Sequence, residues 1–213
     1  HSSAASDVYK RQPYAGDMTL ADYLSSEGKA VSRGGPSLVT TVLNRVHDTV
    51  IDEDSIAAES SWAIQTSERD QSIHQPLQEL RSLDCNDLAL WMFQRLAAAL
   101  AHSHARAVLH GDLKPANVLI RNDGEPALLD FNLSHALDRG QIKHVGGTLP
   151  YMPPESYRAL MGQNVAPHTT SDIYGLGVML YEFVTGRLPY PSPKSSAAVD
   201  LEPAIQLRNR PVV

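Results

Sequence analysis

Apolar side chains recur at helical spacing in two long stretches of the chain. The first covers residues 88–101 and follows a cluster of capping residues at 84–87, so we expect it to form a long central helix. The second covers residues 173–184, has few polar positions and is followed by Gly186. We expect it to form a helix that is buried nearly all round and ends at this glycine.

Shorter apolar runs alternate with turn residues around position 120. We expect these runs to form short strands, two of which pair as a hairpin. Strands are predicted at residues 107–109, 118–120 and 127–129, and a turn at residues 121–125 joins the last two. Asn117 and Asp130 then stand at the two open ends of the hairpin, which brings two oxygen ligands together for a hard cation.

The chain before the central helix is only partly periodic. Thr19 is expected to cap a helix that begins at Leu20. An insert of about 27–83 follows, in which only residues 38–46 have enough apolar periodicity for a short helix, so we expect most of it to be loop or disordered. Residues 1–12 are small and polar, and we expect them to be a non-native or disordered leader.

Composition narrows the class without choosing a function. The chain has 213 residues, of which 42% are hydrophobic and 20% charged, enough to bury one sizeable core. No apolar run approaches the roughly 20 residues that cross a bilayer, and we expect the chain to be cytoplasmic. Its single cysteine, Cys85, excludes an internal disulfide framework and a multi-cysteine metal site. A net charge of -6 argues mildly against nucleic-acid binding.

The densest group of candidate functional residues is His-Gly-Asp-Leu-Lys-Pro-Ala-Asn at 110–117, followed thirteen residues later by Asp130-Phe-Asn-Leu. In this pattern Asp112 can accept a hydroxyl proton and Lys114 can neutralise a migrating phosphoryl group. Asn117 and Asp130 can hold Mg²⁺ on a nucleotide. An isolated Asp-x-Lys in a polar loop is more often a turn cap beside a solvated cation, but the flanking motif favours the catalytic interpretation.

Four motifs in this order resemble those of the C-terminal lobe of a eukaryotic-type serine/threonine protein kinase, with features of the planctomycete-like bacterial members. They are residues 110–117, 130–133, 147–155 and 171–177. A chance match to one is common and to all four in order very rare. The resemblance runs from about Pro13 to Pro191.

The resemblance implies a kinase-like fold that is mainly α (α+β overall), with a short β-hairpin in a C-terminal lobe. Residues 13–213 then form a partial kinase domain, consisting of the hinge and this lobe. The five-stranded N-lobe is expected to be missing before the hinge, and the last helices to be truncated after about Pro191. We therefore expect the isolated chain to transfer little phosphate and the parent protein to be the active form. Whether the parent protein is anchored to a membrane stays open.

The function implied by the resemblance is transfer of the γ-phosphoryl group of ATP to a Ser or Thr hydroxyl of a protein substrate, with Mg²⁺. The implied catalytic residues are Asp112, Lys114 and Thr148; the implied ATP contacts are Lys114, Asn117, Leu119 and Asp130; the implied metal ligands are Asn117 and Asp130. An inactive pseudokinase-like scaffold is the alternative. A small-molecule phosphotransferase is disfavoured, because residues 147–155 resemble a peptide-binding loop.

Three positions depart from the family pattern. Gly111 replaces an arginine that pairs with phosphate on the activation segment, so control by phosphorylation of that segment is not expected. Asn132 replaces the glycine of Asp-Phe-Gly, and asparagine tolerates left-handed backbone angles, so the metal aspartate can still be positioned. Glu155 is expected to be an unpaired carboxylate, because its usual arginine partner falls outside this sequence.

Other polar residues are assigned supporting roles. By resemblance, Asp172 accepts hydrogen bonds from the backbone of the catalytic loop. His110 is expected to be a packed structural histidine rather than an acid or a ligand. The histidines expected at the surface, since their spacing does not converge on a metal, are His102, His104, His144 and His168. Gly175 and Gly177 form Gly-x-Gly inside an apolar helix, which favours helix packing over dinucleotide binding.

Overall fold

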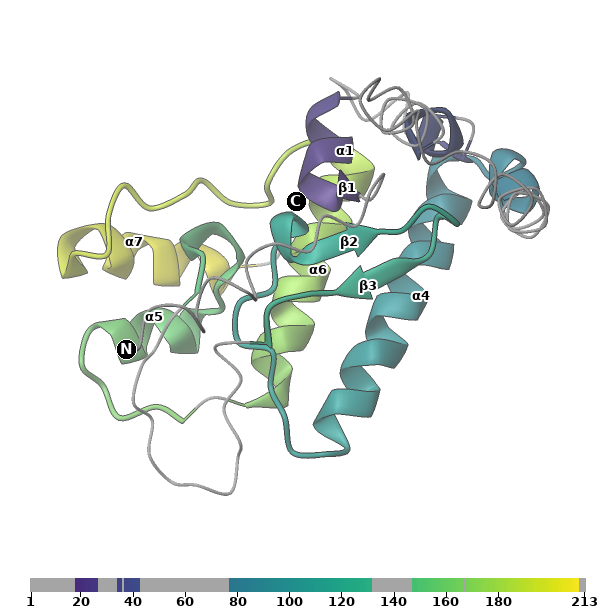
Figure 1. Cartoon of the computed structure of the whole chain (residues 1–213). Helices are drawn as coiled ribbons and strands as arrows, with labels where there is room; N and C mark the ends of the chain where they lie inside the picture. Colours follow the sequence, from purple (N-terminus) through teal and green to yellow (C-terminus); the bar gives the residue numbers. More distant parts are fainter. Residues whose placement is uncertain are drawn as a thin grey trace, which may run out of the picture.

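Two long helices form the centre of the protein. The structure, a computed structural model, describes residues 18–26, 34–35, 37–42, 77–131, 147–166 and 168–210. Helix α4, Cys85–His104, and helix α6, Thr169–Thr185, pack against each other (Figure 1). The Asp84 carboxylate caps α4 by accepting hydrogen bonds from two backbone amides, and α6 ends at Gly186, whose φ of 73° is left-handed. Both predicted helices are confirmed.

Smaller elements surround this pair. Their bounds are β1 Met18–Thr19, α1 Leu20–Ser26, η4 Pro115–Asn117, β2 Val118–Ile120, β3 Pro126–Leu128, η7 Leu149–Tyr151, α5 Pro154–Leu160 and α7 Ala198–Arg208, where η marks a 3-10 helix. Residues 37–42 and 77–81 are also helical. The predicted class, mainly α with a short hairpin, is therefore confirmed. No helix in the described ranges is both long and apolar enough to cross a membrane.

The sheet has three antiparallel strands in the order β1-β2-β3. Val118 lies opposite Leu128, so the predicted hairpin is confirmed, with its second strand one residue earlier than expected. The third strand, β1, was not predicted, because two residues carry no alternating pattern. It extends the sheet by pairing Met18 with Ile120.

The strand predicted at residues 107–109 is wrong. Ala107 has a φ of 57°, which is left-handed, and only Val108 makes a single β-bridge. The amides of Ala107 and Val108 donate to carbonyls in the last turn of α4, at 2.9 and 3.0 Å. The chain therefore closes a turn here, and the catalytic loop leaves the helix directly.

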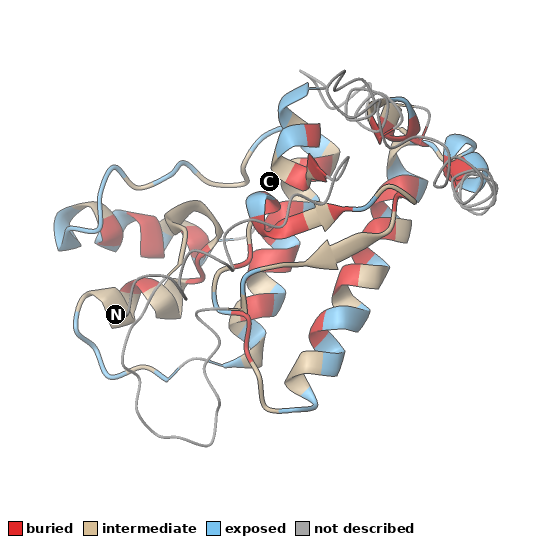
Figure 2. Cartoon of the chain, viewed as in Figure 1, coloured by how far each residue is buried: buried red, intermediate tan, exposed pale blue. Residues whose placement is uncertain are grey.

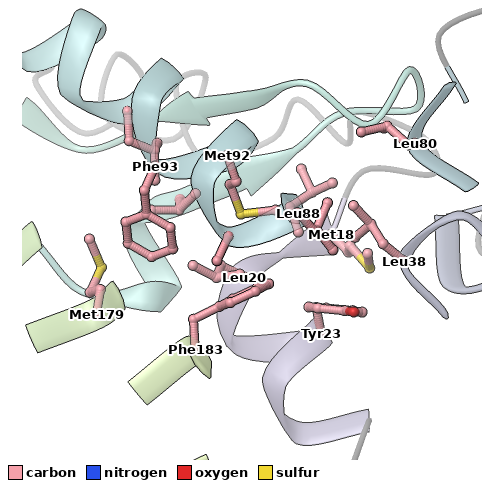
Figure 3. Packing of buried hydrophobic residues seen from close by; sticks show 14 of the residues in the cluster. Met18, Leu20, Tyr23, Leu38, Leu80, Leu88, Met92, Phe93, Met179 and Phe183 are labelled. Carbon is pink, nitrogen blue, oxygen red and sulfur yellow. The ribbon is translucent and has the colours of Figure 1, made fainter. Parts of the chain in front are cut away.

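The main core lies where α1, α4, α6 and the sheet meet, and Figure 3 shows its packing. The Phe183 ring of α6 meets the Phe93 ring of α4 edge to face at 5.8 Å and the Tyr23 ring of α1 at 6.1 Å. Aromatic rings at such distances contribute beyond the apolar area that they bury. One side chain of α6 thus connects it to both neighbouring helices.

Helix α6 is not buried all round, which corrects the sequence-based expectation. Ile173 is 51% exposed, and Gly177 and Leu180 are exposed along the same side (Figure 2). The sequence shows that α6 is composed mainly of apolar residues, but whether a given face is buried depends on the elements that pack against it. Within the described ranges, α4 and η7 cover only part of its circumference.

Part of the insert belongs to the core. The helix over 37–42 confirms most of the short helix predicted there, but residues 77–81 form a second helix where loop was expected. Leu77 and Leu80 are buried, and a Cβ on Gly124 would lie 2.4 Å from Leu80 Cδ1. The hairpin turn thus closes on this helix, and order begins before residue 84.

Several predictions on the N-terminal side have different outcomes. Thr19 caps α1 as predicted, because its hydroxyl accepts the Asp22 amide at 3.2 Å while the Asp22 carboxylate accepts the Thr19 amide at 2.9 Å. The proposed leader and hinge, residues 1–17, and the insert residues 27–33, 36 and 43–76 lie outside the described residues. The missing N-lobe stays a prediction.

We expect Phe183→Ala to lower the free energy of unfolding by about 3–5 kcal/mol, because it removes the ring that joins α1, α4 and α6. Urea unfolding measures the change. Leu90→Ala on α4 is the matched control: Leu90 is 59% exposed, so its loss should stay within about 0.5 kcal/mol. Equal losses for the two variants would contradict this assignment of the core.

Candidate active site

A buried carboxylate holds the loop that follows α4. Asp172, in the first turn of α6, is only 3% exposed. Its Oδ2 accepts the His110 amide and its Oδ1 accepts the Gly111 amide, both at 2.9 Å. A buried charge is tolerated when donors surround it. The supporting role predicted for Asp172 is confirmed.

The third donor to this carboxylate is a histidine that we expected at the surface. His104 Nε2 lies 2.8 Å from Asp172 Oδ2, and the His104 side chain is 13% exposed. The prediction for His104 is wrong because sequence spacing does not reveal a partner so far along the chain. His102 is exposed as predicted, and His168 is exposed at the N-cap of α6, where its ring accepts the Thr170 amide. His144 lies outside the described residues.

His110 is a structural histidine, as predicted. Its ring is fully buried, lies 4.7 Å from the Phe131 ring, and places Nε2 2.8 Å from the Leu129 carbonyl oxygen. Burial lowers the pKa of His110 against the opposing pull of the Asp172 carboxylate. A neutral ring fits this geometry, since Nε2 can donate to Leu129 while Nδ1 accepts the Asp112 amide at 3.4 Å.

The loop and η7 together build a hydrogen-bonded group around Asp112. Lys114 Nζ donates to Asp112 Oδ2 at 2.6 Å, and Thr148 Oγ1 donates to Asp112 Oδ1 at 2.9 Å. Lys114 Nζ also donates to Thr148 Oγ1 at 3.0 Å. The structure thus brings together the three residues predicted to be catalytic, although Thr148 is far from the other two in sequence.

The surroundings of Asp112 favour its ionised form. Burial by itself raises the pKa of this carboxyl, but hydrogen bonds from Lys114 and Thr148, together with the Lys114 charge, outweigh burial. The pKa of Asp112 is therefore lowered from its ordinary value. An ionised carboxylate with directed lone pairs can accept a proton from a hydroxyl group.

The predicted metal ligands lie at the end of the hairpin next to this group. Asn117 is buried, and its Nδ2 donates to the Asp112 carbonyl at 2.8 Å, which orients its side-chain oxygen. The Asn117 carbonyl accepts the Leu129 amide at 2.9 Å, so the residue after Leu129, Asp130, follows at the paired end. Asp130 is exposed with a φ of 57°.

Leu119 lies apart from the hydrogen-bonded group. It is half-buried in the middle of β2, between Thr19 of β1 and Ala127 of β3. If Leu119 contacts the nucleotide, it does so from one face of the sheet and not from the loop at residues 110–117. This role and the metal-ligand roles stay predictions.

A pocket that the sequence did not predict opens beside Asp112. It lies between the catalytic loop, η7, α5 and the start of α6, and Gly111, Gly147 and Gly175 are among its lining residues. Gly111 has a φ of 80°, in the left-handed region that favours glycine. A Cβ on Gly147 would lie 2.8 Å from Met152 Cε. Glycine at these positions thus keeps the backbone close-packed around the Asp112 carboxylate.

Of the two other departures from the family pattern, Glu155 lies within the described residues. Among the described residues no cation pairs with Glu155, and the Ser171 hydroxyl donates to its Oε1 at 3.0 Å. This contact joins α5 to α6. It was not predicted, because a serine near the start of a helix is usually explained by capping and gives no sign of a partner in another helix. Asn132 lies outside the described residues.

Comparison with known proteins gives consistent matches. A profile described as "Protein kinase domain" matches residues 39–209. The chain is 35% identical over 105 residues to the serine/threonine-protein kinase PrkC of Bacillus subtilis (strain 168), covering 48% of this chain and 15% of that protein. It is 42% identical over 103 residues to the serine/threonine-protein kinase PkaA of Streptomyces coelicolor, covering 45% of this chain and 18% of that protein.

Similarity extends to a eukaryotic protein. Aurora kinase A-A of Xenopus laevis is 35% identical over 114 residues, covering 54% of this chain and 26% of that protein. The chain thus spans between 15% and 26% of the length of these curated relatives. The planctomycete-like character stays a prediction.

We expect Asp172→Asn to lower the free energy of unfolding by about 1–3 kcal/mol, because an amide NH₂ then faces a backbone amide that has lost its acceptor. Hydrogen exchange at the His110 and Gly111 amides should speed up more than exchange in α4. Asp123→Asn serves as control, since Asp123 pairs with Arg121 at an exposed site and should change stability by less than about 1 kcal/mol. Unchanged exchange at both loop amides would contradict the assigned role.

We expect Lys114→Met to raise the pKa of Asp112, because it removes the strongest of the interactions that lower it. A lowered folded-state pKa means that Asp112 stabilises the fold above its unfolded pKa, and that this stability is lost as pH falls through the folded pKa. In the variant the loss should begin at higher pH. A ¹³C NMR titration of the Asp112 carboxyl measures the change, with Arg121→Met as control. Superimposable titration curves for Lys114→Met and the unsubstituted protein would rule out this coupling.

Proposed function

The chain belongs to the protein kinase family, in its eukaryotic-type serine/threonine class, and on that premise we propose that the protein transfers the γ-phosphoryl group of ATP to a Ser or Thr hydroxyl of a protein substrate. The observation that carries the proposal is the hydrogen-bonded group formed by Asp112, Lys114 and Thr148. Asn117 joins it through the Asp112 carbonyl.

Asp112 is the base in this proposal. Its carboxylate is ionised and is oriented by three hydrogen bonds. Thr148 donates to Oδ1 at 2.9 Å, and Lys114 at 2.6 Å and Asn117 Nδ2 at 3.4 Å donate to Oδ2. A substrate hydroxyl that approaches the carboxylate can therefore donate its proton to a base that is already aligned. Alignment matters because most of the rate gain in phosphoryl transfer comes from positioning and electrostatics.

Lys114 and Thr148 complete the acceptor side. The Lys114 ammonium has three donors, and two are used by Asp112 and Thr148. The third can reach a phosphoryl oxygen and neutralise the charge that develops during transfer. Thr148 ties the peptide-binding segment to the base, so a Ser or Thr substrate held by that segment would meet Asp112 in the right place.

Asn117 and Asp130 supply the oxygen ligands that Mg²⁺ prefers. The Asn117 amide fits this role, since its Nδ2 is engaged by the Asp112 carbonyl and its oxygen remains for a ligand. The exposed Asp130 carboxylate follows at the paired end of the hairpin. A bound Mg²⁺–ATP would supply the transferable phosphoryl group and screen its charge. Leu119 would then contact the nucleotide from the sheet.

None of the contacts described above favours the alternative function, that of a catalytically inactive scaffold. A binding module of this fold needs neither an ionised Asp112 nor a lysine and a threonine directed at its two oxygens. The proposal also includes a cytoplasmic site of action, where ATP is available and the single cysteine, Cys85, is stable in the reduced form.

We expect Asp112→Ala in the full-length protein to lower kcat by about 10²–10⁴-fold, because it removes the base. Binding of a fluorescent ATP analogue should be almost unchanged, because the loss is of acid-base chemistry. Radiolabelled ATP with casein as acceptor measures kcat. Glu202→Ala, an exposed carboxylate on α7, is the control and should keep full activity. If Asp112→Ala phosphorylates casein as fast as the control, Asp112 has no part in the mechanism.

A further inference from the structure

Arg208, the last residue of α7, is a buried cation with an unusual set of partners. Its side chain is 5% exposed, and its guanidinium lies 4.8 Å from the Tyr157 ring and 5.3 Å from the Tyr190 ring. Among the described residues no carboxylate pairs with it, and its Nε forms no hydrogen bond with them. Burial of a cation without a carboxylate is costly. Stability of α7 alone therefore does not account for this arginine.

The apolar residues of α7 already attach it to α5 and its neighbours. They form a second buried cluster consisting of Met152, Tyr157, Leu201, Ala204 and Ile205. Figure 1 shows α5 and α7 as a pair, and the two helices contact each other directly. The guanidinium of Arg208 is polar and adds little apolar area to the contact between α5 and α7. Its contribution to the structure therefore comes from the polar group with which it interacts.

That polar group is the backbone of η7. Arg208 Nη2 lies 3.5 Å from the Pro150 carbonyl oxygen, while Nη1 donates to Ala204 in its own helix at 3.4 Å. The Tyr157 hydroxyl donates to the preceding carbonyl, that of Leu149. Two stacked side chains, from α7 and α5, thus hold successive carbonyls of one turn.

The turn is also held from a third direction and leads to the active site. The Tyr151 hydroxyl donates to Glu182 Oε2 of α6 at 2.7 Å, and burial raises the pKa of Tyr151, so it remains a donor. The Tyr151 amide donates to the Thr148 carbonyl at 3.0 Å. Since η7 begins directly after Thr148, a shift of the turn moves the Thr148 hydroxyl away from Asp112.

We propose that Arg208 is a positioning residue for phosphoryl transfer, which holds η7 through the Pro150 carbonyl and so keeps Thr148 against Asp112. The inference rests on the proposed function. It assigns α7 a role in catalysis although Arg208 touches neither substrate nor reacting atoms. Displacements of about 1 Å of positioning groups can cost about 100-fold in rate.

The test compares Arg208→Met and Arg208→Lys with Arg106→Met and Arg106→Lys in the full-length protein. Arg106 is an exposed arginine that also donates to a backbone carbonyl, that of His102, at 3.0 Å. We expect Arg208→Met to lower kcat about 10-fold or more while the KM for ATP is unchanged, because alignment rather than nucleotide binding is lost. Arg208→Lys, which keeps a donor for Pro150, should recover part of kcat.

Hydrogen exchange separates this proposal from the proposed function, because it needs no catalysis. The Tyr151 and Met152 amides, both bonded within η7, should exchange faster in Arg208→Met, while amides of α4 should not. If the unsubstituted protein has no kinase activity, the proposed function fails, and this exchange still tests the contact. A kcat of Arg208→Met within twofold of Arg106→Met overturns the proposal. If Arg208→Met does not fold, a kcat of Arg208→Lys equal to that of Arg106→Lys overturns it.

Discussion

The buried carboxylate of Asp172 is the interaction on which the rest of the site depends. A charge removed from water must be met by donors, and here those donors are a side chain at the end of α4 and two successive amides of the loop that follows. One carboxylate therefore fixes where α6 begins, where α4 ends and how the chain turns between them. Without it the amides of His110 and Gly111 would lose their acceptor, and the loop that positions Asp112 would lose its support.

A second carboxylate repeats this principle at lower burial and with a different outcome. Asp172 accepts mainly from backbone amides, which cannot move without moving the loop, so it serves as a fixed support. Asp112 accepts from the side chains of Lys114 and Thr148, which can be exchanged for a substrate hydroxyl without a shift of the backbone. The same residue type is thus a structural support in one place and the proposed base in the other because of the kind of donor that surrounds it.

The sequence predicted elements whose signals are local. The capping residues and spacing of α4, the hairpin around residue 120 and the Thr19 cap all arise within a few positions of one another, and the structure contains them. The sequence-based prediction failed where the reason is a distant partner. His104 is half-buried because it pairs with Asp172, residues 77–81 are helical where the hairpin turn closes on Leu80, and Ile173 is exposed because no described element covers it. Asp112, Lys114 and Asn117 were predictable from the spacing of residues 110–117, and Thr148 from the resemblance carried by residues 147–155, whereas the pocket beside them was not.

Gly111 lacks the side chain that could hold a phosphorylated activation segment, so η7 is held by contacts that do not depend on phosphorylation. In the related pattern an arginine at this position pairs with a phosphate on the activation segment, so the segment can be ordered or released by modification. Here the position has no side chain, and its left-handed backbone, with a φ of 80°, would strain a larger residue. Order in η7 then has to come from contacts that are always present, and the tyrosines at 151 and 157 and the guanidinium at 208 supply them from α6, α5 and α7. We therefore expect the alignment of this site to depend on the packing of the three helices that hold η7.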